Sequence, residues 1–356
     1  MTTPRLRPLL AQLPGYKPGR RPAPGAQPAR LASNETPYPP LPSVVDAVAR
    51  ALGEGHRYPD PACTELVARL SERYGVSPGQ VAVGCGSVAL VQSLVQVTTD
   101  PGEEVLFAWR SFEAYPGFVK VAGAVPVMVP LKGAEHDLDA MAAAVTDRTR
   151  LVLLCTPNNP TGPALQEADV VAFLERVPRD VLVVLDEAYA EFVTEPGAVD
   201  GTRLLADHPN LAVLRSFSKA YGLAGLRVGF CLTASPEVGA ALRQVQVPFA
   251  VSLPAQVAAL ASLDATDELA ERVALVVAER EPLRQALIAL GHDVPPAQGN
   301  FVWLPAGADS DRLAAAFEDA GVLVRCFSGE GVRVTVTTAQ DSERVLAAVR
   351  DLQPAS

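Results

Sequence analysis

The sequence is poor in cysteine, and its few cysteines follow no disulfide or metal-binding pattern. Its 356 residues include five cysteines, none in a C-x-x-C pair: Cys63, Cys85, Cys155, Cys231 and Cys326. An odd number of widely spaced cysteines is not typical of a secreted disulfide framework or of a zinc site. We therefore expect a protein of the reducing cytoplasm that holds no metal.

The sequence also lacks long apolar runs and an excess of positive charge. No run approaches the roughly 20 apolar residues that span a bilayer, and the N-terminal segment "MTTPRLRPLLAQLPGYKPGRRPAPG" lacks the apolar core of a signal peptide. The formal net charge of −10 argues against nucleic acid or a membrane as the main partner. Any anionic ligand would need a local cationic pocket.

What the sequence does contain is a regular alternation of helical and strand patterns. Continuous apolar strands such as "RLVLLC", "DVLVVLD" and "LAVLRS" alternate with helices, which is typical of a mostly parallel sheet covered on both faces. We predict an α/β fold with an N-terminal arm (1–30), a large domain (31–248) and a smaller α+β domain (249–356). Residues near 31–50 are candidates to pack on the smaller domain.

Polar residues follow three of the predicted strands. They are Asn158 and Asn159, then Asp186 and Tyr189, and finally Ser216, Ser218 and Lys219. Ligands of parallel sheets bind beyond the carboxyl ends of the strands, so these residues are candidates for one shared site.

Lys219 lies in an unusually apolar setting, "RSFSKAYGLAGLRVGF", with Arg227 close behind it. Burial lowers the pKa of a lysine and makes its amine a nucleophile able to form a Schiff base. In "GCGSVAL", Gly86 and Ser87 lie at a predicted helix N-terminus, which suits a phosphate group. A buried lysine, a carboxylate and a phosphate site are what pyridoxal 5'-phosphate requires.

With these motifs the sequence resembles the fold-type I aminotransferases, and more closely their histidinol-phosphate aminotransferase branch. The resemblance runs from "LASNETPY" to "VRVTV", and its most specific parts are "DEAYAEF" and "SFSKAYGLAGLRVGF". "LPGYKPGRR", "GCGSVAL" and "AWRSFEAYP" look most like the actinobacterial aromatic aminotransferase offshoot. The resemblance implies a fold-type I pyridoxal-phosphate-dependent transferase, large domain plus smaller C-terminal domain, that acts as a homodimer.

The resemblance also implies roles for individual residues. Lys219 matches the Schiff-base lysine that moves a proton during catalysis, Asp186 matches the partner of the pyridine nitrogen, and Asn159 and Tyr189 match the pair that binds the 3′ oxygen. The cofactor phosphate is assigned to Gly86, Ser87, Ser216, Ser218 and Arg227, with Tyr58 reaching it from the neighbouring subunit and Phe112 stacking on the ring. The substrate is assigned to Tyr16, Asn34, Arg325 and Arg333.

Simpler interpretations of several of these residues stay open. The residues "NPTG" also form a favourable turn, and Gly86 and Ser87 can merely shape a turn between a strand and a helix. Tyr58 and Phe112 can be packing aromatics. Arginines on strands, such as Arg325 and Arg333, often face solvent. The sequence also departs from the family pattern. Thr337 stands where glycine is usual, and Ser87 and Val88 stand where acidic residues are common, so substrate fit could differ.

The expected activity is transamination of phenylalanine, tyrosine or tryptophan with 2-oxoglutarate as amino acceptor. A histidinol-phosphate aminotransferase is the close alternative, because an arginine fork binds both carboxylate and phosphate well. A decarboxylase of the same branch would use the same cofactor residues. The ligand domain of a transcriptional regulator fits least, since only an arm of some thirty residues precedes the fold.

Overall fold

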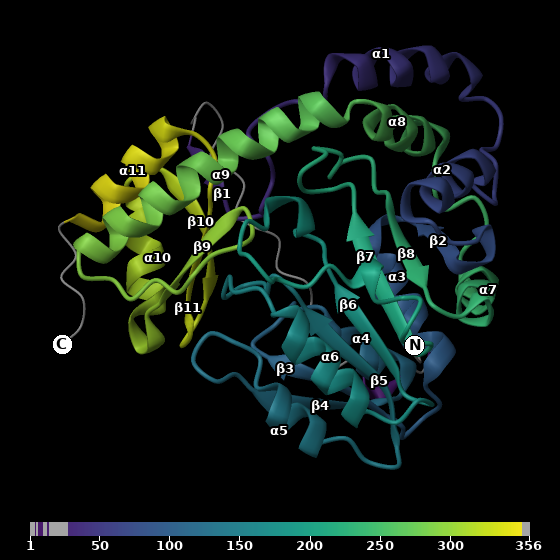
Figure 1. The fold of residues 1–356 in the computed structure, drawn as a ribbon. Coiled ribbons are helices and arrows are strands. Elements are labelled where there is room, and N and C mark those ends of the chain that lie inside the picture. Colours follow the sequence, from purple (N-terminus) through teal and green to yellow (C-terminus); the bar gives the residue numbers. More distant parts are fainter. Residues whose placement is uncertain (1–3, 5, 10–12, 14–27, 351–356) are drawn as a thin grey trace.

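We describe a computed structural model of the chain, which covers residue 4, residues 6–9, residue 13 and residues 28–350. Tyr16 and most of the predicted arm lie outside the described residues. The rest contains two sheets with their helices, joined along one long helix (Figure 1). None of the helices in this described part is both long and apolar enough to cross a bilayer.

The larger sheet has seven strands in the order β2-β8-β7-β6-β5-β3-β4. Its strands are β2 (Val81–Gly84), β3 (Glu104–Trp109), β4 (Val125–Pro130), β5 (Thr149–Cys155), β6 (Leu182–Asp186), β7 (Leu211–Ser216) and β8 (Gly229–Thr233). Strands β4, β3, β5, β6 and β7 pair in parallel, whereas β8 runs antiparallel to both of its neighbours, β2 and β7. The prediction of a mostly parallel sheet is confirmed.

The central strands are buried on both faces, which explains their uninterrupted apolar sequences. In β6, Val183 and Leu185 belong to one hydrophobic cluster, and Leu182 and Val184 to another on the opposite face. Each such side chain, buried from water, stabilises the fold by about 1.5–3 kcal/mol. The helices of this part of the chain are α1 (Pro42–Ala51), α2 (Thr64–Tyr74), α3 (Gly86–Thr98), α4 (Tyr115–Ala122), α5 (Leu138–Ala143), α6 (Glu167–Arg176), α7 (Pro236–Val245) and α8 (Leu253–Asp264).

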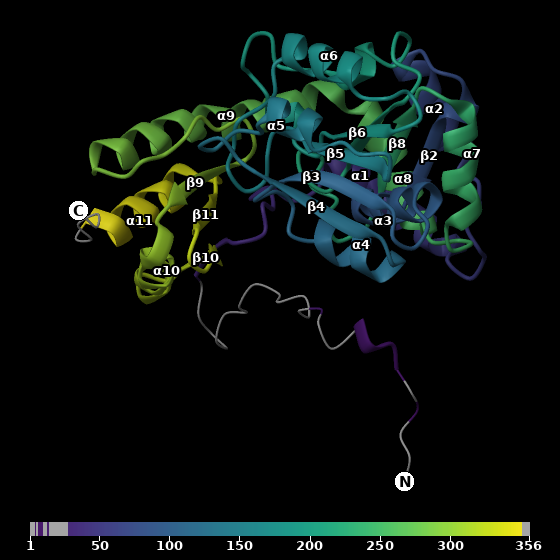
Figure 2. The same ribbon diagram turned by 90° about the horizontal axis from the view of Figure 1, so that it is seen from below.

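The smaller sheet is formed by one strand near residue 30 and three strands between residues 301 and 335. Its order is β1-β10-β11-β9, formed by β1 (Ala29–Leu31), β9 (Phe301–Pro305), β10 (Val322–Phe327) and β11 (Gly331–Thr335). Strand β1 pairs in parallel with β10, so the last two residues of the predicted arm and the residue after them are part of this sheet. Its helices are α9 (Thr266–Ala289), α10 (Ser310–Asp319) and α11 (Ala339–Arg350), and α9 extends from α8 to the far side of the smaller sheet (Figures 1 and 2).

Strand register brings the three polar turns to one edge of the larger sheet. Cys155 of β5 is opposite Asp186 of β6, and Asp186 is opposite Leu214 of β7. Because the strands are parallel and end almost level, the turns that follow them emerge side by side. The carboxyl ends of these strands face the smaller sheet (Figure 2).

Candidate active site

Lys219 is the central residue of the candidate site and lies in the turn after β7. Its Nζ donates a hydrogen bond to the carbonyl oxygen of Ser33 at 3.1 Å and lies 5.6 Å from the centre of the Tyr189 ring. Burial, helped by the positive charge of Arg333, lowers the pKa of Lys219 to about 7. At and above neutral pH much of this amine is therefore uncharged and nucleophilic.

Asp186, the last residue of β6, is buried beside this lysine, with its side chain only half satisfied by the protein. Its Oδ2 accepts a hydrogen bond from the Tyr115 hydroxyl at 2.7 Å, while its Oδ1 is buried without a hydrogen-bond partner among the described residues. Burial raises the pKa of Asp186, and the Tyr115 hydrogen bond opposes that rise. A buried acceptor with no donor is costly, so this oxygen is suited to a donor supplied by a ligand.

A candidate anion site lies where Arg227 meets the N-terminus of α3. Gly86 begins this helix at a φ of 77°, and a Cβ on it would lie 2.5 Å from Nη2 of Arg227. Arg227 Nη1 donates to the Ser218 hydroxyl at 3.3 Å, and the Ser218 amide donates to the Ser216 hydroxyl at 3.1 Å. A guanidinium, two hydroxyls and the amides of Gly86 and Ser87 thus gather at a helix N-terminus, where anions bind favourably.

Asn34 connects the segment after β1 to the candidate site. Its side-chain amide donates to the Tyr189 hydroxyl at 2.9 Å, and its backbone amide donates to the Thr335 hydroxyl at 3.0 Å. Asn34 is fully buried and has a positive φ of 54°, a conformation that asparagine tolerates better than most residues. Burial raises the pKa of Tyr189 to about 12, so its hydroxyl stays protonated.

Two arginines of the smaller sheet reach toward the larger one. Arg333 is buried, and it donates to Oδ1 of Asn159 and, at 2.6 Å, to the carbonyl oxygen of Ala32. Arg325 is directly opposite Arg333 in the β10–β11 pair, and its Nη2 donates to both carboxylate oxygens of Glu113, at 2.7 and 2.6 Å. Arg333 of the smaller sheet therefore contacts a predicted site residue of the larger sheet, and Arg325 contacts the loop after β3.

The predicted aromatic residues differ in their positions. Phe112 packs edge-on against Tyr115 with ring centres 5.4 Å apart, and so lies next to the residue that binds Asp186. Tyr58 is not part of this group, since 82% of it is exposed and it stacks on Phe249 with ring centres 4.5 Å apart.

The structure also places two polar residues beside the predicted Asn158, namely Ser111 and His136, that the sequence analysis did not assign to the site. The Oδ1 of Asn158 accepts from the Ser111 hydroxyl at 2.7 Å and lies 3.2 Å from Nε2 of His136. Burial lowers the pKa of His136 to about 4, so its ring is neutral. This network holds the turn that carries Asn159.

Tyr115 is a further site residue that the sequence analysis did not assign. It lies in the quoted motif "AWRSFEAYP" and could have been noticed there, but its contact with Asp186 could not have been predicted from the sequence.

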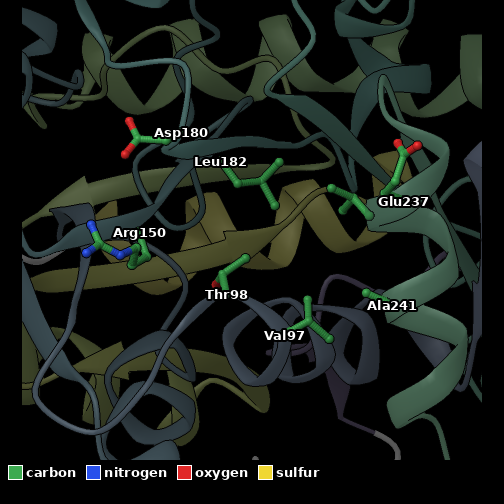
Figure 3. A pocket seen from close by; sticks show the side chains of 8 residues that line it. Val97, Thr98, Arg150, Asp180, Leu182, Glu237 and Ala241 are labelled. Atoms are coloured by element: carbon green, nitrogen blue, oxygen red, sulfur yellow. The ribbon is translucent and has the colours of Figure 1, made fainter.

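One pocket lies at the opposite end of the large sheet. It has a volume of about 310 Å³ and is lined by residues that include Arg150, Leu182 and Glu237, near the N-terminal ends of β5 and β6 (Figure 3). Ligands of such sheets bind at the carboxyl ends of the strands, so this pocket is a poor candidate for the active site.

Among the described residues no cluster of three or more metal-binding side chains occurs.

Comparison with known proteins agrees with this geometry. The family model "Aminotransferase class I and II" matches residues 27–349. The chain belongs to this aminotransferase family. It is 54% identical to an aromatic amino acid aminotransferase of Thermobifida fusca, over 98% of this chain and 97% of that one, and 56% identical to one of Streptomyces avermitilis, over 94% of each.

Solved structures place this aminotransferase in the predicted fold. The histidinol-phosphate aminotransferase of Sinorhizobium meliloti in complex with pyridoxal-5'-phosphate superimposes with a TM-score of 0.89, is 30% identical, and the match covers 98% of both chains. An aspartate aminotransferase of Thermus thermophilus superimposes with a TM-score of 0.82 at 25% identity, over 92% of both chains. The prediction of a fold-type I aminotransferase is confirmed.

The described residues fit pyridoxal phosphate, the group held by that Sinorhizobium meliloti protein. The unpartnered Oδ1 of Asp186 suits the N–H of a protonated pyridine ring, and the uncharged amine of Lys219 suits the aldehyde. A Cβ at residue 86 would lie only 2.5 Å from Nη2 of Arg227, so the guanidinium would have to move; such close approach is expected where backbone amides and an arginine share a phosphate.

The first prediction concerns this cradle. Gly86→Ala should weaken cofactor binding at least about tenfold, because the new Cβ would push the Arg227 guanidinium out of place and alanine disfavours a positive φ. Titration of the apoenzyme with pyridoxal phosphate measures the change. Gly117→Ala is the matched control, since nothing lies within 4 Å of its Cβ position, and it should bind like wild type. Unchanged affinity in Gly86→Ala would remove this helix terminus from the phosphate site.

The second prediction concerns Asp186. Asp186→Asn should keep the cofactor bound but lower kcat at least about 100-fold, because a neutral amide does not favour a protonated ring nitrogen. Tyr115→Phe is the control; it removes one hydrogen bond but retains the carboxylate, and a loss of about tenfold is expected. Steady-state transamination assays on cofactor-saturated protein measure both. Near wild-type turnover of Asp186→Asn would rule out the assigned role.

Proposed function

We propose that this aminotransferase uses pyridoxal 5'-phosphate to transfer the amino group of phenylalanine, tyrosine or tryptophan to 2-oxoglutarate. The observation that carries the choice of substrate is the match to aromatic amino acid aminotransferases at 54–56% identity over nearly the whole chain. The histidinol-phosphate aminotransferase of Sinorhizobium meliloti covers the chain equally well but is only 30% identical.

When bound, pyridoxal phosphate supplies an electron sink for the bond broken at the substrate Cα. The residues that would hold it are Asp186 at the ring nitrogen, Asn159 and Tyr189 at the 3′ oxygen, Phe112 on the ring face, and the cradle of Gly86, Ser87, Ser216, Ser218 and Arg227 at the phosphate. The Tyr115 hydroxyl keeps Asp186 oriented and favours its ionised form. Asn34 orients the Tyr189 hydroxyl in the same way.

Lys219 is the proposed acid–base group. With a pKa lowered to about 7, its Nζ can take a proton from the substrate Cα near neutral pH and later release it, which suits general acid–base catalysis. Arg333 is the proposed partner of the substrate carboxylate, since its guanidinium is buried beside Asn159 and its charge helps to lower the pKa of Lys219. Arg333 would thus place the Cα of an amino acid next to the lysine. Tyr16 is proposed to contact the aromatic side chain.

The substrate proposal has a direct test. Holoenzyme assayed with saturating 2-oxoglutarate should show a kcat/KM for phenylalanine at least about tenfold above that for histidinol phosphate, because burial of an aromatic ring contributes a few kcal/mol. Both donors are measured on the same preparation. A hundredfold preference for histidinol phosphate would overturn the proposal in favour of the alternative. Release of carbon dioxide in place of a 2-oxo acid would identify a decarboxylase.

We further propose that the enzyme is a homodimer in which Tyr58 reaches the cofactor phosphate of the partner subunit. Tyr58 and Phe249 form an exposed aromatic pair, and Val247 and Leu52 are exposed nearby in the sequence at 73% and 60%. Large apolar side chains that remain exposed together often mark a protein–protein contact. A tyrosine that does not join its own subunit's site is consistent with this arrangement.

Mixing two inactive variants tests this arrangement. Tyr58→Ala and Lys219→Ala chains, mixed and allowed to exchange, should recover at most about a quarter of wild-type activity, because half of the dimers are mixed and each has one intact site. Each variant alone is the control, and exchange is followed by mass spectrometry on differently tagged chains. Mixed dimers with no activity would place Tyr58 in the site of its own subunit.

A further inference from the structure

A buried ion pair joins the carboxyl ends of β6 and β7. Glu187 directly follows Asp186, and Arg215 is the last residue but one of β7. Arg215 donates to Oε2 of Glu187 through Nε at 2.8 Å and through Nη2 at 2.6 Å, and the exposed fractions of the two side chains are 1% for Glu187 and 11% for Arg215. Because successive side chains of a strand project to opposite faces, this pair lies on the face opposite to Asp186.

The second carboxylate oxygen of Glu187 is also occupied. Its Oε1 accepts from the backbone amide of Gly201 at 2.7 Å. A Cβ at residue 201 would lie 3.0 Å from this oxygen and 2.4 Å from Cδ1 of Leu185, so the absence of a side chain lets the amide approach. One carboxylate thus connects the end of β6, the end of β7 and the turn at residue 201.

These contacts act on the segments that carry the two central residues of the candidate site. The backbone amide of Glu187 extends the pairing of β6 with β7, since it donates to the carbonyl oxygen of Leu214 at 2.9 Å. Glu187 is next to Asp186 in the chain, and Arg215 is four residues before Lys219. A movement of one strand end against the other would therefore change the position of Asp186 relative to Lys219.

We propose that Glu187 is a positioning residue, which joins the ends of β6 and β7 and so holds the Asp186 carboxylate in place at the cofactor ring. The inference rests on the proposed function in one respect, namely that Asp186 pairs with the ring nitrogen of pyridoxal phosphate. A catalytic group displaced by about 1 Å can lose about 100-fold in rate. The ion pair therefore affects turnover as well as stability.

A carboxylate suits this position, and its amide isostere does not. Both oxygens of Glu187 accept hydrogen bonds, whereas glutamine has one accepting oxygen and would turn an N–H donor toward Arg215 or toward the Gly201 amide. Burial raises the pKa of Glu187 to about 7, and the charge of Arg215 opposes that rise. At pH 8 the carboxylate is therefore mostly ionised.

The test compares Glu187→Gln and Glu187→Asp with the control Glu104→Gln, all as holoenzyme. Glu187→Asp keeps the charge but is one methylene too short to reach both donors, and it decides the question if Glu187→Gln does not fold. Glu104 is likewise a buried glutamate of the large sheet, 5% exposed and paired with Arg148, but it begins β3 at the opposite end of the sheet. Melting temperatures should fall in all three variants, whereas only those at residue 187 should change the site.

The first readout is the pH at which the absorbance of bound pyridoxal phosphate is half changed. A protonated ring nitrogen carries a positive charge that disfavours a proton on the Lys219 nitrogen. Weaker pairing with Asp186 should therefore raise this midpoint, by at least about 0.5 pH unit in both Glu187 variants and by less than about 0.2 in Glu104→Gln. Loss of the Glu187 charge alone would lower the midpoint, so the sign separates positioning from a simple charge effect.

The second readout is turnover at pH 8. The kcat should fall at least about tenfold in Glu187→Gln, at least about threefold in Glu187→Asp and less than about twofold in Glu104→Gln. Glu187→Gln should cost less than about twofold when Asp186→Asn is already present, because the effects of coupled residues are not additive. An unchanged or lowered midpoint in the Glu187 variants, an equal rise in Glu104→Gln, or a full tenfold loss on top of Asp186→Asn would each overturn the proposal.

This result is separate from the fate of the proposed function. If Asp186→Asn alone keeps near wild-type turnover, the role of Asp186 fails, whatever the Glu187 variants show. If Asp186→Asn loses turnover and the Glu187 variants keep the wild-type midpoint, the role of Asp186 stands and that of Glu187 fails.

Discussion

Parallel pairing of β5, β6 and β7 is the constraint on which the candidate site depends. Because Cys155, Asp186 and Leu214 are in register, the three strands end together and their turns share one edge of the sheet. A slip of one residue between β6 and β7 would turn Asp186 to the other face and separate it from Lys219. Such a slip would also require both apolar clusters to repack, since every residue from Leu182 to Leu185 is buried on one face or the other.

The sheet edge alone is not a complete site, because the smaller sheet supplies the other half. The contact between Arg333 and Asn159 joins β11 to the turn after β5, and the contact between Asn34 and Tyr189 joins the segment after β1 to the turn after β6. Strand β1 makes the second contact possible, because it anchors that segment on β10. Residues positioned by the smaller sheet, Arg333 among them, therefore lie close to a lysine held by the larger one.

Burial shifts the two central ionisable groups in opposite directions. It lowers the pKa of Lys219 and raises that of Asp186, so each is driven toward its neutral form. An unsatisfied buried polar group costs about 1–3 kcal/mol, and Oδ1 of Asp186 is such a group in the described protein. A ligand that donates to this oxygen relieves the cost, and binding of such a ligand also stabilises the folded chain. The unsatisfied Oδ1 of Asp186 is thus suited to a donor supplied by a ligand.

Local pattern was enough to predict the strands and the polar turns at their ends. The apolar runs before Asp186 and Lys219 identified buried parallel strands, and the glycine and serine of "GCGS" identified a helix terminus, because these features depend on neighbours in the sequence. Partners far apart in the sequence could not be predicted in this way. Tyr115 contacts Asp186 71 residues away, and Arg325 contacts Glu113 212 residues away. Which charges meet there is decided by how the smaller sheet packs on the larger one. The sequence alone therefore determined the fold and the polar turns that follow its strands, whereas only the tertiary structure decided that Arg325 forms an ion pair with Glu113.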